Sequence, residues 1–148
     1  MNPKARILVV DDNRSLTLIM ARILQREGFE ALLAFDGEAG LQKAREEKPD
    51  LIILDIVMPG MDGYQVCRHL QEDSNTARIP VVMISVKGRV DEEGITPSEV
   101  EGRVLERREG FTVGATDFLS KPIRTENLLE RVRFLLWLAE QGTGKEQV

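Results

Sequence analysis

Five short runs of aliphatic residues lie along the chain, and none of them alternates between apolar and polar positions. They occupy residues 6–10, 30–34, 51–54, 81–84 and 117–119. Continuous apolarity over so short a stretch is typical of a strand that is buried on both faces of a sheet. The pattern therefore predicts five strands in the interior of one sheet.

Amphipathic stretches separate these runs. Residues 16–23, 39–44, 64–70 and 128–139 carry apolar side chains at helical spacing, and Gly28 and Pro49 follow the first two stretches as stop signals. Strict alternation of strands and helices favours right-handed crossovers and a parallel sheet covered by helices on both faces. The predicted fold class is α/β, a doubly wound five-stranded parallel sheet of (βα)5 order.

The fourth crossover is longer than such a unit requires. It spans residues 86–116, whereas a helix with two short loops needs roughly 16 to 24 residues. The sequence Thr96-Pro97-Ser98-Glu99 has the pattern of a capping box with proline at the first helical position. We therefore expect a helix from Pro97 to about Val113, and an insertion near residues 87–95, between the fourth strand and the fourth helix.

Composition and charge indicate which kinds of partner and which location to expect for the chain. The chain has 148 residues and a formal net charge of −5 at pH 7, which gives no electrostatic support for direct binding to nucleic acid. No apolar run approaches the roughly 20 residues of a membrane span, and no signal-like segment opens the chain. We expect one cytoplasmic domain at residues 1–141, a flexible tail at residues 142–148 and protein partners, with no membrane contact. The single cysteine, Cys67, is expected to be a packing residue.

Polar residues stand where the predicted strands end. Asp11 and Asp12 follow the first strand, Asp55 ends the third, Ser85 ends the fourth and Lys121 follows the fifth. In an open parallel sheet the carboxyl ends of the strands meet at one edge, where ligands bind. Three neighbouring carboxylates repel one another unless a cation lies among them, and oxygen ligands with several waters suit Mg²⁺. The sequence therefore predicts a magnesium site at this edge.

Asp55 is the candidate nucleophile of this site. A carboxylate can attack phosphorus and form an aspartyl phosphate. The charge of the transferred phosphoryl group would then be shared by Mg²⁺, the Lys121 ammonium group and the Ser85 hydroxyl group. Aspartates at strand ends and helix caps are common without any such role, but all five polar residues at one edge favour phosphoryl chemistry.

Four motifs together resemble the receiver domains of two-component response regulators, the chemotaxis-regulator-like family. They are VVDDN at residues 9–13, LDIVMPGMDG at 54–63, Ile84-Ser85, and GATDFLSKP at 114–122. The resemblance covers roughly residues 5–140, and the motifs follow the family's order. It implies a flavodoxin-like fold and phosphorylation of Asp55 by a histidine kinase or phosphotransfer protein. It also implies a signalling switch that assists its own phosphorylation and is not a metabolic enzyme.

The resemblance also assigns ligands and contacts around Asp55. It implies that Asp11, Asp12, Asp55 and the backbone carbonyl of Val57 hold Mg²⁺, and that Lys121 contacts the phosphoryl group. A domain of this kind passes its signal to a downstream protein partner or to an effector domain. The family pattern therefore implies a protein-interaction surface that changes with phosphorylation.

The switch itself is implied to involve Ser85 and Phe118. In the family, the hydroxyl group after the fourth strand moves toward the phosphate and opens room for an aromatic ring on the fifth strand. Phe118 holds that place here, although a buried core role is the alternative reading. The peptide bond before Pro122 is expected to be cis, which directs Lys121 inward.

Two departures keep other functions open. Val86 follows Ser85 where receivers usually have alanine or glycine, so a pseudo-receiver that binds partners without phosphorylation is the first alternative. A haloacid-dehalogenase-like phosphatase also uses an aspartate nucleophile and Mg²⁺, but it needs a second aspartate two residues on, where Val57 stands. We therefore prefer the receiver interpretation.

The last predicted helix carries apolar residues on two sides. One side holds Leu128, Val132, Leu135 and Ala139, and the opposite side holds Phe134, Trp137 and Leu138. Exposed aromatic residues often mark protein contacts, so the second side is expected to bind a partner or to form a homodimer. Packing against a neighbouring helix or against the insertion is the alternative.

Overall fold

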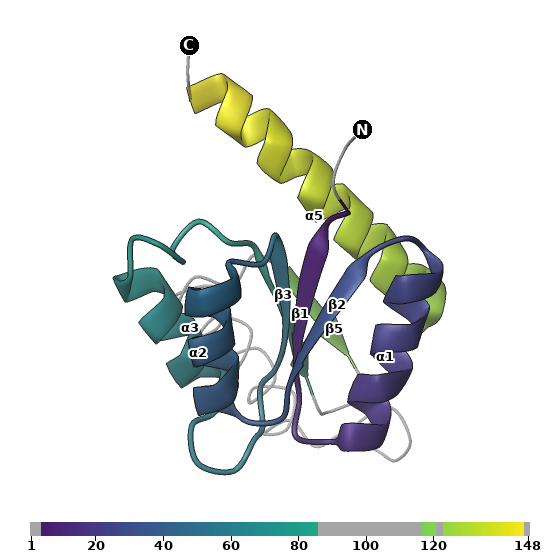
Figure 1. Ribbon diagram of the computed structural model, residues 1–148, viewed down its shortest axis with the longest axis vertical. Helices are drawn as coiled ribbons and strands as arrows, with labels where there is room; N and C mark the ends of the chain where they lie inside the picture. The colour runs from purple at the N-terminus through teal and green to yellow at the C-terminus, as the bar shows by residue number, and fades with distance from the viewer. Residues whose placement is uncertain (1–3, 86–116, 121–122, 147–148) are drawn as a thin grey trace, which may run out of the picture.

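The computed structural model describes residues 4–120 except 86–116, and residues 123–146 (Figure 1); for Ser85 and residues 142–146 only the backbone is considered. The elements are β1 (Arg6–Val10), α1 (Arg14–Arg26), β2 (Glu30–Ala34), α2 (Gly37–Glu47), β3 (Leu51–Asp55), α3 (Gly63–Glu72), β4 (Val81–Ser85), β5 (Asp117–Ser120) and α5 (Thr125–Glu146). Every predicted strand is present, and each one starts at the predicted residue. The predicted helix from Pro97 and the insertion at 87–95 lie outside the described residues.

The five strands form one parallel sheet in the order β2-β1-β3-β4-β5. The chain runs outward from β1 to β2, and then returns across β1 to β3, so the order reverses at β1. The register places Val10 of β1 opposite Leu54 of β3, and Asp55 opposite Ile84 of β4. The α/β fold class is therefore confirmed, and the switch point of the sheet lies between β1 and β3.

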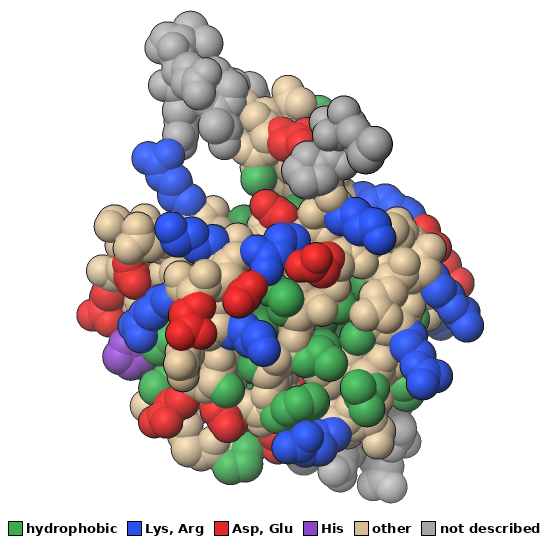
Figure 2. Space-filling model, viewed as in Figure 1, with side chains coloured by type: hydrophobic (Ala, Val, Ile, Leu, Met, Phe, Trp, Pro, Cys, Tyr) green, Lys and Arg blue, Asp and Glu red, His purple; other side chains and the backbone are tan. Residues whose placement is uncertain are grey.

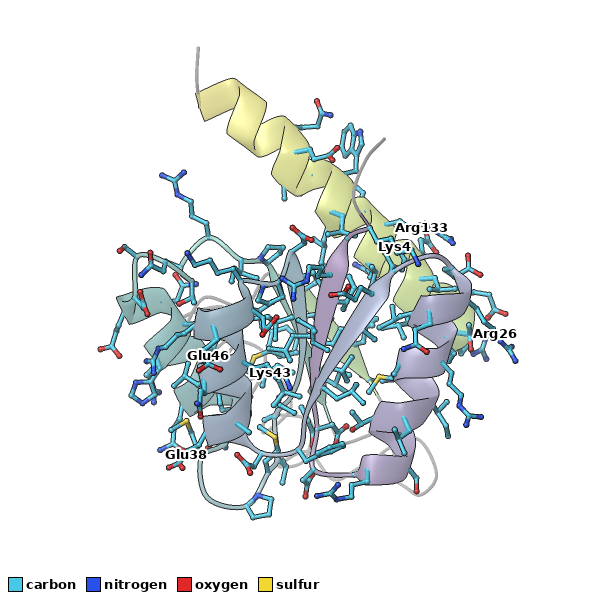
Figure 3. All side chains as sticks on the ribbon, in the orientation of Figure 1. Lys4, Arg26, Glu38, Lys43, Glu46 and Arg133 are labelled. Atoms are coloured by element: carbon cyan, nitrogen blue, oxygen red, sulfur yellow. The ribbon has the colours of Figure 1, made fainter. Side chains whose placement is uncertain are left out.

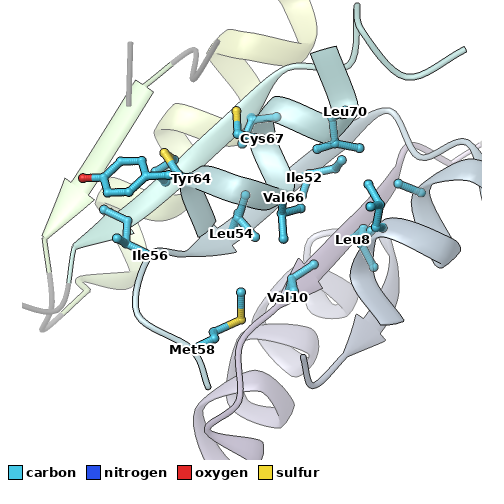
Figure 4. Close-up of a cluster of buried hydrophobic side chains, with 14 of the residues drawn as sticks. Leu8, Val10, Ile52, Leu54, Ile56, Met58, Tyr64, Val66, Cys67 and Leu70 are labelled. Carbon is cyan, nitrogen blue, oxygen red and sulfur yellow. The ribbon is translucent and has the colours of Figure 1, made fainter. Parts of the chain in front are cut away.

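The core consists of two layers, one on each face of the sheet. Alternate strand residues face α2 and α3, among them Leu8, Val10, Ile52, Leu54 and Met83. The intervening residues face α1 and α5, among them Ile7, Val9, Ile53, Val82 and Ile84. Figure 4 shows the first layer, in which side chains of β1 and β3 meet those of α3. Burial on both faces explains why the strands read as unbroken apolar runs.

Cys67 lies in the first of these layers. It is fully buried on α3, and this burial raises the pKa of its thiol group to about 11. The thiol is therefore neutral over the physiological pH range and packs as a small apolar side chain. This position agrees with the packing role expected from its isolation in the sequence.

Three helices begin with a side-chain cap close to the carboxyl end of the preceding strand. Asn13, Asp36 and Asp62 are the N-caps of α1, α2 and α3, and each accepts a hydrogen bond from the backbone N–H group three residues later. Such caps satisfy N–H groups that have no partner within the helix. The caps fix where each helix starts, and all three starts lie at the sheet edge that carries the candidate site.

Helix α5 is longer than predicted. It continues to Glu146, beyond the predicted end at Ala139, so its backbone overlaps the predicted tail at residues 142–148. The division into a domain at 1–141 and a tail stays a prediction. Arg131 pairs with Asp117 of β5 at 2.5 Å, and Arg133 pairs with Glu27 at the end of α1, beside Arg26 (Figure 3). The first pair joins α5 to the sheet, and the second joins it to the end of α1.

The two apolar sides of α5 have different surroundings. Leu128, Val132 and Leu135 are buried, whereas Phe134, Trp137 and Leu138 are 52%, 54% and 42% exposed. Ala139 lies on the same predicted side as the buried residues but is exposed, because α5 has by then run past the end of the sheet (Figure 1). On the face of the molecule shown in Figure 2, basic, acidic and apolar side chains are interspersed. No helix among the described residues has the length and apolar character to span a membrane.

The contact between α2 and β1 yields a test of the packing. A Cβ atom on Gly40 would lie 2.8 Å from both γ carbons of Val10, which is too close. Alanine normally favours a helix over glycine by about 1 kcal/mol, but overpacking costs about 1–3 kcal/mol. We therefore expect Gly40→Ala to lower the free energy of unfolding, measured by urea denaturation.

A double variant isolates this contact. Val10→Ala removes both γ carbons, so Gly40→Ala should cost less in that background than in the wild-type chain. A Gly40→Ala variant that is more stable than the wild type would contradict this packing.

Candidate functional site

Two neighbouring strands bring the acidic residues together. Asp55 is the last residue of β3, and Asp11 and Asp12 directly follow Val10, the last residue of β1. Because Val10 is paired with Leu54, Asp11 lies beside Asp55 at the same edge. One carboxylate oxygen from each of Asp11, Asp12 and Asp55 lies within 4.8 Å of the other two. The predicted acidic cluster is therefore present.

The surroundings of the three carboxylates differ. Asp11 and Asp55 are each 1% exposed, whereas Asp12 lies at the surface. The Asn13 N–H group donates a hydrogen bond to Asp11 Oδ1 at 3.0 Å, and the hydroxyl group of Thr17 donates to the Asp11 carbonyl oxygen at 3.1 Å. The start of α1 thus fixes Asp11 from both its side chain and its main chain, while Asp12 leaves the cluster open to solvent.

The donor set fits a divalent cation. Buried carboxylates are unfavourable unless other groups or a metal ion offset their charge, and three of them in close contact add mutual repulsion. All three side chains offer oxygen, which is the donor preferred by hard cations such as Mg²⁺ and Ca²⁺. Asp11, Asp12 and Asp55 are therefore residues that could hold a metal ion at the rim of the sheet.

The loop between β3 and α3 borders this cluster. Ile56 and Met58 are buried in the core, whereas the Val57 side chain between them is 52% exposed (Figure 4). Gly60 has a φ angle of +76°, which side-chain-bearing residues rarely adopt, and it turns the chain toward α3. The two buried anchors and this turn fix the path of the chain immediately after Asp55.

Other predicted site residues lie on β4 and β5. Ser85 ends β4 and is paired with Ser120 of β5, but its side chain lies outside the described residues. Lys121 and Pro122 also lie outside them, so the phosphate contact and the cis peptide bond stay predictions. Phe118 is buried in the core layer of α2 and α3, which agrees with both its core reading and its proposed part in switching.

Sequence reasoning missed the part played by Gly63. Its N–H group donates to the Ile56 carbonyl oxygen at 2.8 Å, and the residue is buried against the end of β3. A Cβ atom there would lie only 2.5 Å from the Asp55 carbonyl oxygen. The sequence signal was a glycine directly after the N-cap Asp62, but only the distances reveal the contact with Asp55.

Comparison with known proteins places the same motifs in one family and identifies similar proteins. The chain matches the model of the response regulator receiver domain over residues 7–97. It is similar to protein PilH of Pseudomonas aeruginosa, with 37% identity over 132 residues that cover 89% of this chain and 98% of PilH. It is also similar to response regulator PleD of Caulobacter vibrioides, with 42% identity over 132 residues that cover 88% of this chain and 26% of PleD.

A solved structure has the same architecture. Chemotaxis protein CheY4 of Vibrio cholerae superimposes with a TM-score of 0.75 and 30% sequence identity, over 90% of this chain and 99% of that protein. Two other relatives are named as DNA-binding regulators. The matched region covers 48% of the length of RpaA from Synechocystis and 50% of the length of MtrA from Mycolicibacterium paratuberculosis. The chain thus spans half or less of several curated relatives.

Charge repulsion within the cluster yields a second test. In a chelating buffer, Asp12→Asn removes one of three close negative charges, so we expect the melting temperature to rise by a few degrees. Glu130→Gln, on the exposed surface of α5, removes the same charge outside the cluster and should have little effect. An equal melting temperature shift in both variants would mean that net charge, and not the cluster, is responsible.

Proposed function

The chain belongs to the response regulator receiver domain family, and on this basis we propose that it is a phosphorylation-dependent switch of a two-component system. Asp55 is the proposed phosphoacceptor, and a histidine kinase or phosphotransfer protein is the proposed donor. The observation that carries this proposal is the cluster of Asp11, Asp12 and Asp55, with oxygens within 4.8 Å at the switch point of the sheet.

The residues of the site have separate parts in the proposed reaction. A carboxylate oxygen of Asp55 forms a bond to phosphorus, and the bond between phosphorus and the donor breaks. Asp11, Asp12, Asp55 and the Val57 carbonyl group are the proposed ligands of Mg²⁺. When bound, Mg²⁺ supplies positive charge that offsets the charge on the phosphoryl oxygens.

Residues of β4 and β5 complete the proposed site. The backbone of Ser85 ends β4, and Lys121 follows Ser120, the last residue of β5, in the sequence; their hydroxyl and ammonium groups are the proposed further members of the site. Both are proposed to contact phosphoryl oxygens after transfer. A shift of Ser85 toward the phosphate, followed by Phe118, is the proposed change that alters the surface of the domain.

The exposed apolar surface of α5, formed by Phe134, Trp137 and Leu138, is the proposed place of protein contact. The rings of Phe134 and Trp137 are stacked, with their centroids 6.3 Å apart, so the two side chains present one continuous surface. Clustered exposed aromatic residues are typical of protein interfaces. We propose that this surface binds a second copy of the chain or a downstream partner or effector domain.

Direct contact between this chain and nucleic acid is not part of the proposal. The net charge of −5 opposes binding to phosphate backbones, and the DNA-binding names belong to relatives that extend well beyond the matched region. A cytoplasmic location is proposed because two-component phosphotransfer takes place there.

Phosphorylation by a small-molecule donor tests the proposed function. Incubation with acetyl phosphate and Mg²⁺ should add one phosphoryl group, detected by intact mass spectrometry. The adduct should be absent from Asp55→Asn and from a reaction that contains a chelator, because both remove a part of the site. Asp50→Asn, which changes an aspartate outside the cluster, should still be phosphorylated.

The alternative function is a pseudo-receiver that binds partners without phosphorylation. A folded wild-type chain that binds Mg²⁺ but never gains the adduct would support this alternative and would refute the phosphoacceptor role of Asp55. Val86 is the first residue to replace in that case, because it follows Ser85 where receivers usually have alanine or glycine.

The α5 surface yields a separate test. Trp137→Glu places a charge at its centre, so self-association or partner binding should be lost while folding is retained, because Trp137 is 54% exposed. Sedimentation velocity with and without acetyl phosphate measures the mass of the assembly. Arg22→Glu on α1 is a control for altered surface charge. An unchanged mass and unchanged partner binding would remove the proposed contact.

A further inference from the structure

We propose that Gly63 is a positioning residue for Asp55. The absence of a side chain at Gly63 lets the first turn of α3 rest directly on the last peptide group of β3, and this contact sets where the Asp55 carboxylate lies relative to Asp11 and Asp12. The inference deepens the proposed function and rests on it for one of its two measurements. It assigns a functional reason to a glycine that lies against the main chain of Asp55.

The contact between Gly63 and β3 is formed by backbone atoms on both sides. The Gly63 N–H group donates to the Ile56 carbonyl oxygen at 2.8 Å. A Cβ atom on Gly63 would lie 2.5 Å from the Asp55 carbonyl oxygen and 2.8 Å from Ile56 Cα. Ordinary contact begins near 3.4 Å, so a methyl group at this position requires a shift of about 0.9 Å, the difference between 3.4 and 2.5 Å.

Helix α3 cannot easily take up this shift. Asp62 and Gln65 form a capping box at its start, with both hydrogen bonds at 2.9 Å. Val66, Cys67 and Leu70 are buried in the core, so a movement of α3 would disturb close-packed side chains. The strain from a larger residue at position 63 therefore falls in large part on the peptide group that follows Asp55.

The end of β3 has little freedom of its own. The Ile56 N–H group donates to the Ile84 carbonyl oxygen at 3.1 Å, and the Ile56 side chain is buried. A pushed peptide group would therefore rotate within these limits and carry the Asp55 side chain with it. Gly63 thus acts on Asp55 through the main chain, and not by contact with the carboxylate.

Small displacements matter at this site. Mg²⁺ requires near-ideal octahedral geometry with ligand distances of about 2.0–2.1 Å, so a ligand moved by most of an ångström is no longer in place. A misplacement of about 1 Å in a reacting group lowers rates by about 100-fold. A residue that holds Asp55 to within a fraction of an ångström therefore affects both metal affinity and phosphorylation.

The test compares Gly63→Ala with a variant that is destabilised elsewhere. Leu24→Ala is suitable because Leu24 is fully buried near the end of α1 that is remote from Asp11, in the other core layer. Mg²⁺ affinity is measured by calorimetric titration, and the rate of Asp55 phosphorylation by acetyl phosphate is measured at saturating Mg²⁺. Both variants are studied at a temperature at which they are fully folded.

We expect Gly63→Ala to weaken Mg²⁺ binding and to slow phosphorylation by about 10- to 100-fold, while Leu24→Ala keeps both values near those of the wild type. Equal values for the two variants, or wild-type values for Gly63→Ala, would overturn the inference. If the wild type binds Mg²⁺ but is not phosphorylated, the proposed function fails and Mg²⁺ affinity alone decides the role of Gly63.

A second variant keeps the test decisive if Gly63→Ala does not fold. Asp62→Ala removes the N-cap and loosens the first turn of α3 without adding an atom at position 63. The support behind the Asp55 peptide group is then reduced, so Mg²⁺ affinity and the phosphorylation rate should fall in the same direction. Asp50→Ala, which removes a side-chain hydrogen bond with the Arg6 N–H group near the opposite end of β3, is the matched control and should leave both unchanged.

Discussion

Repulsion among three carboxylates is the constraint on which the functional edge of this fold depends. Asp11, Asp12 and Asp55 lie within 4.8 Å of one another, and two of them are buried, so the cluster opposes folding unless the rest of the domain offsets it. The offset comes from a sheet buried on both faces, whose central strands β1, β3 and β4 contribute apolar side chains to both core layers. A cation bound among the three carboxylates would relieve this repulsion, since its positive charge would offset theirs.

Rigid support of the cluster follows from where the helices start. Each N-cap near the site edge satisfies helix N–H groups and also fixes the loop that leaves the preceding strand. At Asp11 the support comes from Asn13 and Thr17, and at Asp55 it comes from Gly63. Asp11 and Asp55 are thus supported by contacts that each include a main-chain atom, and such contacts permit less movement than contacts between two flexible side chains.

The sequence allowed the strands and the acidic cluster to be predicted, because two-sided burial leaves an unbroken apolar run and strand order decides which ends meet. The predicted end of the last helix at Ala139 was wrong, because helical spacing does not indicate where a helix leaves the sheet that it covers. Gly63 was missed because its effect depends on a distance of 2.5 Å to a backbone atom, and glycine after an N-cap has many other causes.

The attachment of α5 offers a physical link between the site and the exposed apolar surface. Asp117 accepts hydrogen bonds from the Phe118 N–H group at 2.7 Å and from Arg131 of α5 at 2.5 Å. Asp117, which joins α5 to β5, is therefore the sequence neighbour of Phe118, the aromatic residue that is proposed to move. The same carboxylate contacts both Phe118 and Arg131. In the proposed switch, a movement of Phe118 would alter the geometry at Asp117 and, through Arg131, would act on the helix that carries Trp137.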